Sequence, residues 1–347
     1  MLILTLDPGS TSLKFALFQN ETEQKRNVIR FNQNILDLQL PERAVHCEKL
    51  VTEFLRAEGV EARDIDCVVA RGGFLKNLKT GAYKINERLI ADLDGTIMPT
   101  PQTLGIRIAY HMMHPLGKPC FIYDAVTADE WDPKTKVTGV KGLEKTVAQH
   151  TLNSRRVAFE LAEQMGRPMT DINLIVAHLG GGFDVSFFRK GRIIESLGYN
   201  DLGFSPERCG ALQFDDLLRL EKTLPPDEFR ALNHGKGGLV SHFGTSDMRQ
   251  VEAMIRKGDQ EAKLVFDAML YRVAQLIGCG AVALQGQVDG IILTGGGAYS
   301  DYIFNEIRAN VEFIAKVHRF AGELELEALA RGAYRVLAGQ EPAEPYV

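Results

Sequence analysis

A turn rich in hydroxyl groups follows the first apolar run of the sequence. The run Leu2–Leu6 is typical of a strand, and Asp7-Pro-Gly-Ser-Thr-Ser-Leu-Lys14 comes next. The backbone N–H groups of a tight turn, short hydroxyl side chains and a lysine can all donate hydrogen bonds to phosphate oxygens. The GxxxxGK[ST] spacing of a Walker loop is absent. We interpret Ser10, Ser12 and Lys14 as candidate phosphate ligands, with an ordinary hairpin turn as the alternative.

Two glycine triplets come after later apolar runs. Consecutive glycines permit positive φ angles and let a ligand approach the backbone closely. The second triplet precedes a predicted helix, an arrangement typical of phosphate binding at a helix N-terminus. The candidate nucleotide-binding glycines are Gly180, Gly181 and Gly182 in the first triplet and Gly295, Gly296 and Gly297 in the second.

Several charged side chains are placed where they could act on a phosphoryl group. Arg71 ends an apolar strand before two glycines, and Arg208 lies in a loop bounded by Gly and Pro. A guanidinium group is planar and stays charged, which suits phosphate and carboxylate. Asp124 ends a strand and Glu325 lies near the start of the last predicted helix, positions where carboxylates often hold Mg²⁺. His150 precedes the helical stretch Thr151–Met165. Surface charges and helix caps are the alternative interpretations.

Strand-like and helix-like segments alternate along the whole chain, which predicts the α/β class. Apolar runs predict strands at Leu2–Leu6, Lys14–Gln19, Cys67–Ala70, Cys120–Tyr123, Leu174–His178, Asp184–Phe188 and Gly290–Thr294. Helical periodicity predicts helices at Ala44–Glu58, Leu104–His114, Thr146–Met165, Gln260–Leu284, Tyr302–Ala309 and Leu324–Ala338.

The hydroxyl turn and the first glycine triplet sit in similar surroundings. Each joins two predicted strands, and the two copies lie about 170 residues apart. This weak repeat predicts a duplicated domain in which each copy has one phosphate-facing hairpin.

Composition narrows the functional classes. The net charge is −5 and the basic residues are dispersed, which argues against a nucleic-acid partner. The sequence contains no uninterrupted run of about 18 apolar residues, which argues against a membrane span. The first residues lack the basic stretch of a signal peptide, and the five cysteines show no CxxC spacing. We expect a cytoplasmic protein with reduced thiols.

Taken in order, these motifs resemble the acetate and butyrate kinases, and most closely the butyrate kinase branch. The resemblance covers nearly the whole chain. Its most specific pieces are Ala70-Arg-Gly-Gly73, Phe121-Ile-Tyr-Asp124, Gln149-His-Thr-Leu-Asn153, Phe204-Ser-Pro-Glu-Arg208, Gly235-Lys-Gly-Gly238 and Gly244-Thr-Ser-Asp-Met-Arg249. It implies a duplicated actin-like ATPase (ribonuclease H-like) fold with a cleft between two domains. Residues 1–148 and 326–347 would form the carboxylate-side domain, and residues 149–325 the nucleotide-side domain.

The resemblance also implies roles for the candidate residues and two cofactors, ATP and Mg²⁺. Lys14, Ser10 and Ser12 would face the transferred phosphoryl group, and Arg71 would bind a small carboxylic acid or its acyl phosphate. His150 and Arg208 would stabilise the transferring phosphoryl group. The metal would be organised by Asp124 and Glu325, and the adenosine site would be lined by Asp247, Arg249 and Gly295–Gly297. A homo-oligomer is the family expectation.

Some residues depart from the family pattern. Asp7 stands where the family usually has Asn, so it either binds metal or repels ATP phosphates unless a cation compensates it. Residues 100–103 replace a run that usually contains His. Phe183, Tyr199 and Cys209 are further changes, and Phe183 or Tyr199 could reshape the acyl pocket.

These departures leave two alternatives open. One is a diverged nucleotide-binding relative with weak or altered activity. The other is a sugar or polyol kinase on the same superfold, with Asp124 as general base. The acid, the favoured direction and the oligomeric state are open at this point.

Overall fold

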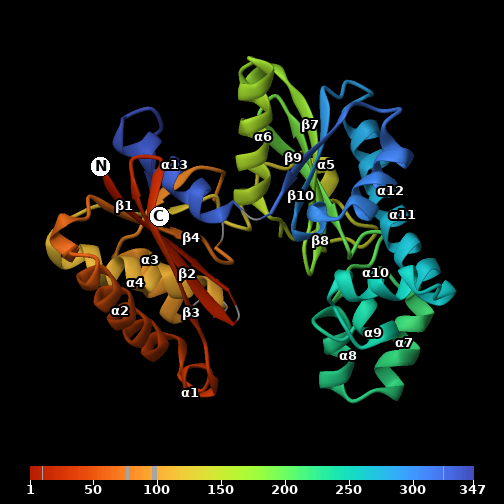
Figure 1. Cartoon of the computed structure of the whole chain (residues 1–347), viewed down its shortest axis with the longest axis horizontal. Helices are drawn as coiled ribbons and strands as arrows, with labels where there is room; N and C mark the ends of the chain where they lie inside the picture. Colours follow the sequence, from red (N-terminus) through yellow and green to blue (C-terminus); the bar gives the residue numbers. More distant parts are fainter. Residues whose placement is uncertain (10, 76–77, 96–99, 323) are drawn as a thin grey trace. The chain divides into compact units, whose positions relative to one another are not determined.

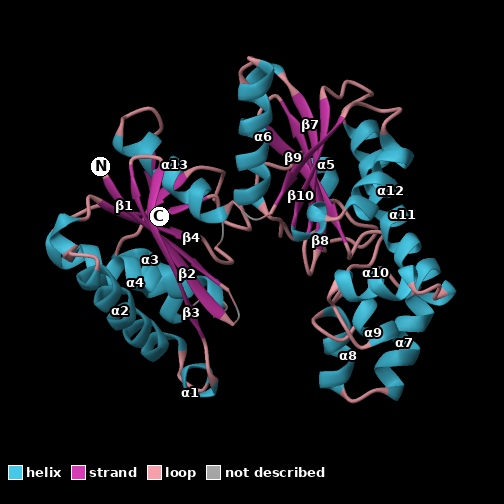
Figure 2. Ribbon diagram, viewed as in Figure 1, coloured by secondary structure: helices cyan, strands magenta, loops and turns pink. Residues whose placement is uncertain are grey.

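The computed structural model describes residues 1–9, 11–75, 78–95, 100–322 and 324–347. Within them the chain forms two compact α/β units, each built on a mixed sheet (Figures 1 and 2). Unit 1 consists of Met1–Asp129, Thr146–Arg156 and Leu324–Val347, and unit 2 of Glu130–Lys145 and Val157–Glu323. The grouping thus places residues 130–145 in unit 2 and residues 149–156 in unit 1, unlike the predicted boundaries.

The sheet of unit 1 has the strand order β12-β5-β6-β4-β1-β2-β3. Strands β1 and β2 form an antiparallel hairpin, whereas β1, β4 and β6 run parallel. The strands are β1 Leu2–Pro8, β2 Ser12–Gln19, β3 Thr22–Arg30, β4 Cys67–Arg71, β5 Ala82–Lys84, β6 Cys120–Tyr123 and β12 Ala343–Pro345.

Helices cover both faces of this sheet, which explains why its central strands are apolar on both sides. Leu4 and Leu6 of β1 pack into the core with α2 and α4, while Ile3 packs on the opposite face with α13 (Figure 1). The helices are α1 Gln33–Leu36, α2 Leu40–Ala57, α3 Glu87–Gly95, α4 Leu104–Met113 and α13 Glu325–Leu337, with 3₁₀ turns at Ala62–Asp64, Pro101–Thr103 and His114–Leu116.

The sheet of unit 2 has the strand order β11-β10-β7-β8-β9. Strands β7 and β8 form an antiparallel hairpin, and β7, β10 and β11 run parallel. Its strands are β7 Asn173–Leu179, β8 Phe183–Arg189, β9 Arg192–Gly198, β10 Gly290–Gly295 and β11 Val317–Ala321.

The two sheets share one strand pattern, so the predicted duplication is present in the fold. The order β6-β4-β1-β2-β3 of unit 1 corresponds to β11-β10-β7-β8-β9 of unit 2, with the same parallel and antiparallel neighbours. The hydroxyl turn joins β1 to β2, and the first glycine triplet joins β7 to β8. Both turns therefore occupy equivalent places.

Helices α11 and α12 pack on the sheet of unit 2, and a group of shorter helices lies between β9 and α11 in the sequence. Helix α11 packs Phe266, Val273 and Ile277 into the sheet core beside α12. The helices are α5 Pro133–Lys136, α7 Phe214–Thr223, α8 Pro226–Asn233, α9 Leu239–Phe243, α10 Met248–Arg256, α11 Gln260–Ala283 and α12 Asp301–Val311, with 3₁₀ turns at Met169–Asp171 and Gly296–Tyr299.

Helix α11 is long and apolar enough to cross a membrane by length and composition alone. Of its most apolar window, 44% is buried inside the protein, and core helices of globular proteins pass the same test. The feature is accounted for by its packing on the sheet of unit 2.

Helix α6, Thr151–Met165, starts later than the sequence indicates. The prediction began it at Thr146, but residues 146–150 are not helical. The backbone N–H of Gln149 instead donates to the carbonyl of Val126, at 3.0 Å. This bond ties the segment before α6 to the loop after β6, and it places His150 directly before the helix.

Candidate active site

The carboxyl ends of three neighbouring strands bring charged side chains to one edge of the unit 1 sheet. Strands β1, β4 and β6 are parallel and adjacent, with Leu6 paired to Ala70 and Arg71 paired to Tyr123. Asp7, Arg71 and Asp124 therefore stand at the same edge, where ligands of open α/β sheets usually bind. The sequence proposed all three as site residues.

Asp7 pairs with Arg71 and stands opposite Lys14 in the β1–β2 hairpin. Its Oδ1 is 3.4 Å from Nη1 of Arg71, and its Cα is paired across the hairpin with that of Lys14. Directly paired residues on antiparallel strands project to the same face of the sheet. The carboxylate that replaces the family's Asn is therefore compensated by positive charge within the site.

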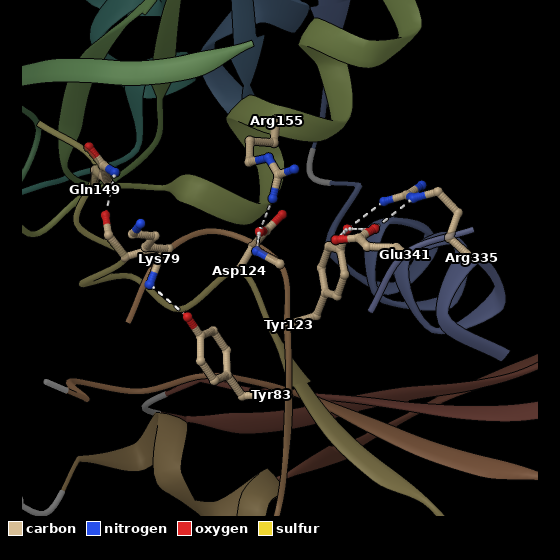
Figure 3. A network of polar contacts seen from close by, with 10 residues as sticks. Lys79, Tyr83, Tyr123, Asp124, Gln149, Arg155, Arg335 and Glu341 are labelled. Carbon is tan, nitrogen blue, oxygen red and sulfur yellow. Dashed lines mark hydrogen bonds and ion pairs between the residues drawn. The ribbon is translucent and has the colours of Figure 1, made fainter. Parts of the chain in front are cut away.

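Asp124 is buried and held by specific partners. Its backbone is left-handed, with φ of 48°, and only 2% of the residue is exposed. Oδ1 accepts a hydrogen bond from the N–H of Gly81, at 2.8 Å, and pairs with Nη1 of Arg155 (Figure 3). Burial raises the pKa of Asp124, and the charge of Arg155 opposes that rise. Asp124 is fixed in place by two neighbours.

The remaining unit 1 candidates lie at element ends. Glu325 is the first residue of α13 and is 5% exposed. His150 is half-buried, and its carbonyl accepts from the N–H of Ser154 in the first turn of α6. Ser12 opens β2. Ser10 lies outside the described residues.

The predicted metal ligands do not form a ready-made cage. Among the described residues no three His, Cys, Asp or Glu side chains are grouped to hold a metal ion. Asp7 and Asp124 stand two strands apart, which separates their backbones by about 10 Å. Mg²⁺ is usually held by one or two carboxylates together with substrate phosphates and water. Buried carboxylates at a strand end and a helix start fit that mode of binding.

In unit 2 the first glycine triplet and the Arg208 loop are joined directly. The carbonyl of Gly181 accepts hydrogen bonds from Oγ of Ser205, at 2.8 Å, and from the N–H of Glu207, at 3.3 Å. A methyl group placed on Gly182 would lie 3.8 Å from Nη2 of Arg208. The structure therefore brings together two motifs that the sequence proposed separately.

Arg208 is flanked by an aromatic ring and a carboxylate. Its guanidinium carbon lies 5.4 Å from the ring centre of Tyr199, and Nη1 lies 3.4 Å from Oε2 of Glu207. Its Nε is buried and makes no hydrogen bond within the described part of the chain. A guanidinium with an unused donor beside an exposed glycine turn is well suited to an anionic ligand.

Glycines with no room for a side chain hold this loop. A methyl group on Gly210, Gly237 or Gly238 would overlap backbone atoms of residues 203–209 or of Leu232. The N–H of Gly235 adds a 2.9 Å bond to the carbonyl of Glu207. The run Gly235–Gly238, one of the motifs that resemble the acetate and butyrate kinases, thus packs closely against the Arg208 loop.

The second glycine triplet packs against Leu179, the residue directly before the first triplet. Methyl groups on Gly295 and Gly297 would approach atoms of Leu179 to 2.7 and 2.9 Å, so these glycines are required for packing, whereas Gly296 faces open space. The side chain of Met248 also contacts the Gly297 position, at 3.3 Å. The Asp247–Arg249 segment and both triplets therefore adjoin one another.

Asp247 has a local structural role. It caps α10 by accepting from the N–H of Arg249, at 3.0 Å, and its carboxylate pairs with the Arg249 guanidinium, at 2.8 Å. Hydrogen bonds from Arg249 lower the pKa of Asp247 to about 2. The Arg249 side chain is 89% exposed. An adenosine-binding role for this pair stays a prediction.

Some residues that shape the site were not found from the sequence. Arg155 and Gly81 were not considered, because only the fold brings them to Asp124. Tyr199 was considered only for the acyl pocket, but it lies against Arg208. A tyrosine nine residues before a loop arginine gives no local signal of such a contact.

A buried polar cluster behind the first triplet was also missed. Asp184 is paired across the β7–β8 hairpin with His178, and both are at most 5% exposed. Oδ2 of Asp184 accepts from the hydroxyls of Ser186 and Ser196, at 3.4 and 3.3 Å. A methyl group on Gly180 would lie 3.1 Å from Nε2 of His178, so the histidine of this pair adjoins the Gly180–Gly182 turn.

Solved structures share this fold. The chain is similar to acetate kinases from Porphyromonas gingivalis (18% identity, TM-score 0.79, 97% of this chain and 99% of that one) and Entamoeba histolytica (17%, 0.78, 96% and 98%). It is also similar to a ROK hexokinase from Thermus thermophilus, with 14% identity, a TM-score of 0.52 and coverage of 98% and 100%. These likenesses confirm the actin-like fold.

A sequence model of the acetokinase family matches residues 143–317. The matched region includes the first glycine triplet, the Arg208 loop, the Asp247–Arg249 segment and the second triplet. It covers just over half of the 347 residues. The chain therefore belongs to the acetokinase family, and is a phosphotransferase with a carboxyl group as acceptor.

Proposed function

We propose that this chain transfers the γ-phosphoryl group of ATP reversibly to a short or branched-chain fatty acid of the butyrate type, giving an acyl phosphate. The main observation in support is Arg71 at the carboxyl edge of the unit 1 sheet. Its Nη1 pairs loosely with Asp7, and its Nε is buried without a hydrogen-bond partner among the described residues. A planar guanidinium with an unused donor matches the two oxygens of a carboxylate.

The other residues support the phosphoryl half of the reaction. Such a transfer needs positioning and neutralisation of charge on the phosphoryl oxygens more than covalent chemistry. We propose that the Gly180–Gly182 turn and Arg208 bind the phosphates of ATP, and that Lys14 and His150 meet the phosphoryl group as it transfers. Mg²⁺, when bound, would neutralise phosphate charge. Asp124 and Glu325 would hold it.

The butyrate type of acceptor is proposed on the motifs of the sequence. The runs Ala70–Gly73, Gln149–Asn153 and Gly235–Gly238 resemble the butyrate kinase branch, and unit 2 uses the last of them to support the Arg208 loop. Structures of both acetate kinases and a propionate kinase from Francisella tularensis (18% identity, TM-score 0.76) share the fold, which leaves the choice among short acids to experiment.

A polyol kinase is less well supported. That reaction needs a carboxylate free to accept a proton from a hydroxyl group. Asp124, the candidate base, already has Gly81 and Arg155 on Oδ1 and is 2% exposed. The same surroundings suit a fixed carboxylate that organises charge.

Acyl phosphate formation tests the proposal. Purified protein is incubated with ATP, Mg²⁺ and each straight or branched acid from C2 to C6, and the acyl phosphate is trapped as its hydroxamate. We expect the highest kcat/KM for four- or five-carbon acids, and a loss of about 10²–10³-fold in Arg71→Gln. Arg88→Gln is the matched control, because that arginine is on the surface of unit 1 with 65% of its side chain exposed. No acyl phosphate from any acid, in protein that binds ATP, would overturn the proposal.

A further inference from the structure

A closed polar network lies beside the Asp124 turn. The hydroxyl of Tyr123 donates to Oε2 of Glu341, at 2.7 Å, and accepts from Nη2 of Arg335, at 2.5 Å. Nε of Arg335 also donates to Oε2 of Glu341, at 3.0 Å (Figure 3). Each of the three polar groups is thus bound by the other two. The network connects β6 to the segment that follows α13.

The ring of Tyr123 is buried and closely packed against α13. It is 2% exposed, and a methyl group on Gly332 of α13 would come within 2.7 Å of its ring atoms. The residue immediately before Asp124 is therefore fixed by both packing and hydrogen bonds.

The network also reaches the other partner of Asp124. Gly81, with φ of 110°, donates to Oδ1 of Asp124 and accepts from its N–H, at 3.0 Å. A methyl group on Gly81 would lie 3.1 Å from Oε1 of Glu341. Glu341 therefore lies beside the glycine that binds Asp124, and both of its carboxylate oxygens accept from the hydroxyl of the neighbouring Tyr123.

A left-handed backbone at a non-glycine residue is held only where its surroundings fix it. Asp124 has this conformation, and Gly81, Arg155 and Tyr123 supply the constraints. Glu341 lies beside the first of these constraints, Gly81, and is hydrogen-bonded to another, Tyr123. Glu341 lies in a segment that β12 anchors to the sheet edge by pairing with β5.

We propose that Tyr123, Arg335 and Glu341 are positioning residues that hold Asp124 in the geometry required for phosphoryl transfer. The inference rests on the proposed function, because it assumes that Asp124 organises charge in that reaction. The three residues would act through Asp124 without touching substrate. Loss of one hydrogen bond in the network would loosen the paired hydrogen bonds between Gly81 and Asp124 and lower the rate of transfer.

The test compares two tyrosines in the same unit that each donate to a carboxylate. Tyr123→Phe removes the hydroxyl bound to Glu341, while Arg335 and Glu341 keep their direct bond. Tyr346→Phe is the matched control, since its hydroxyl donates to Asp92 at 3.1 Å and the residue is 6% exposed. Tyr346 is not bonded to Gly81 or Asp124.

We expect Tyr123→Phe to lower kcat about tenfold with the KM values for acid and ATP within twofold, because small displacements of a reacting geometry are costly. Amide hydrogen exchange at Gly81 and Asp124 should become several-fold faster. Tyr346→Phe should change neither kcat nor amide exchange at Gly81 and Asp124. Its melting temperature should fall about as much as that of Tyr123→Phe. Glu341→Gln is the second variant if Tyr123→Phe does not fold.

The background of Asp124→Asn shows whether the effect passes through Asp124. There, Tyr123→Phe should reduce kcat by less than twofold further, because residues that act as a unit are not additive. Equal effects of the two tyrosine changes on kcat and exchange, or full additivity with Asp124→Asn, would overturn the inference. If the wild type forms no acyl phosphate, the proposed function fails, and the exchange comparison alone decides whether the network holds the turn.

Discussion

Asp7→Asn is the most informative single change, because it restores the residue that the family usually has. Asp7 lies 3.4 Å from Arg71, the group proposed to bind the substrate carboxylate. An acid bound to that guanidinium would place a second negative charge close to Asp7. Asparagine keeps an oxygen that can accept from Arg71 and removes the charge. We therefore expect tighter binding of the acid.

The size of the effect follows from Coulomb's law. Two like charges about 6 Å apart repel by roughly 3 kcal/mol at an effective dielectric constant of about 20. The Arg71 side chain is 18% exposed, so solvent screens part of this repulsion. Halving the energy leaves about 1.4 kcal/mol, which corresponds to about a tenfold lower KM for the acid. The unscreened value sets an upper limit of about 100-fold.

The assay measures KM for the acid, KM for ATP and the Mg²⁺ requirement by hydroxamate formation. Asp66→Asn is the control for loss of one negative charge. Asp66 accepts from the N–H of Leu2, at 2.7 Å, at the opposite end of β1, about 15 Å from Asp7. An unchanged or raised KM for the acid in Asp7→Asn would refute the electrostatic reasoning. A raised Mg²⁺ requirement would instead identify Asp7 as a metal ligand.

Three further predictions concern unit 2. Tyr199→Leu should lower kcat by about three- to tenfold by removing the ring beside the Arg208 guanidinium, whereas Tyr199→Phe keeps the ring and should stay within twofold. Gly238→Ala should lower the melting temperature by several degrees or prevent folding, because its methyl group would overlap a neighbouring carbonyl; Gly258→Ala, also at positive φ but in open space, should cost much less. Burial tends to raise the pKa of Asp132, but hydrogen bonds from Arg189 and Arg192 outweigh it and lower that pKa. The stabilising effect of the Asp132 carboxylate is therefore present above about pH 4 and is lost as the pH falls through the lowered value. In urea unfolding, Asp132→Asn should therefore be less stable than wild type at pH 7, with the difference shrinking toward pH 3.

The buried strands could be predicted because their composition is decisive. The apolar runs Leu2–Leu6 and Leu174–His178 are both strands, and nearly all of their residues are buried. Strand β3, Thr22–Arg30, was not predicted because it is almost wholly exposed and rich in charged residues. It is extended because β2 pairs with it along the hairpin, a tertiary cause that local pattern does not report.

The candidate site was predicted at the ends of strands and missed at their partners. Asp7, Arg71 and Asp124 are recognisable because a charged residue directly follows or ends an apolar run. Arg155, the partner of Asp124, is 31 residues away in the sequence, and Glu341 is 218 residues from Tyr123. Such contacts depend on which strands become neighbours, so only the folded sheet reveals them.

The discontinuity of unit 1 has a consequence for how the chain folds during synthesis. Unit 2 is nearly continuous and lies before residue 324, so all of its strands leave the ribosome before α13 does. Unit 1 needs α13 to cover one face of its sheet and β12 to complete the sheet edge. Domains generally fold as units in the order of translation. Unit 1 is therefore begun first and completed last. One apolar face of its sheet stays uncovered while unit 2 is synthesised.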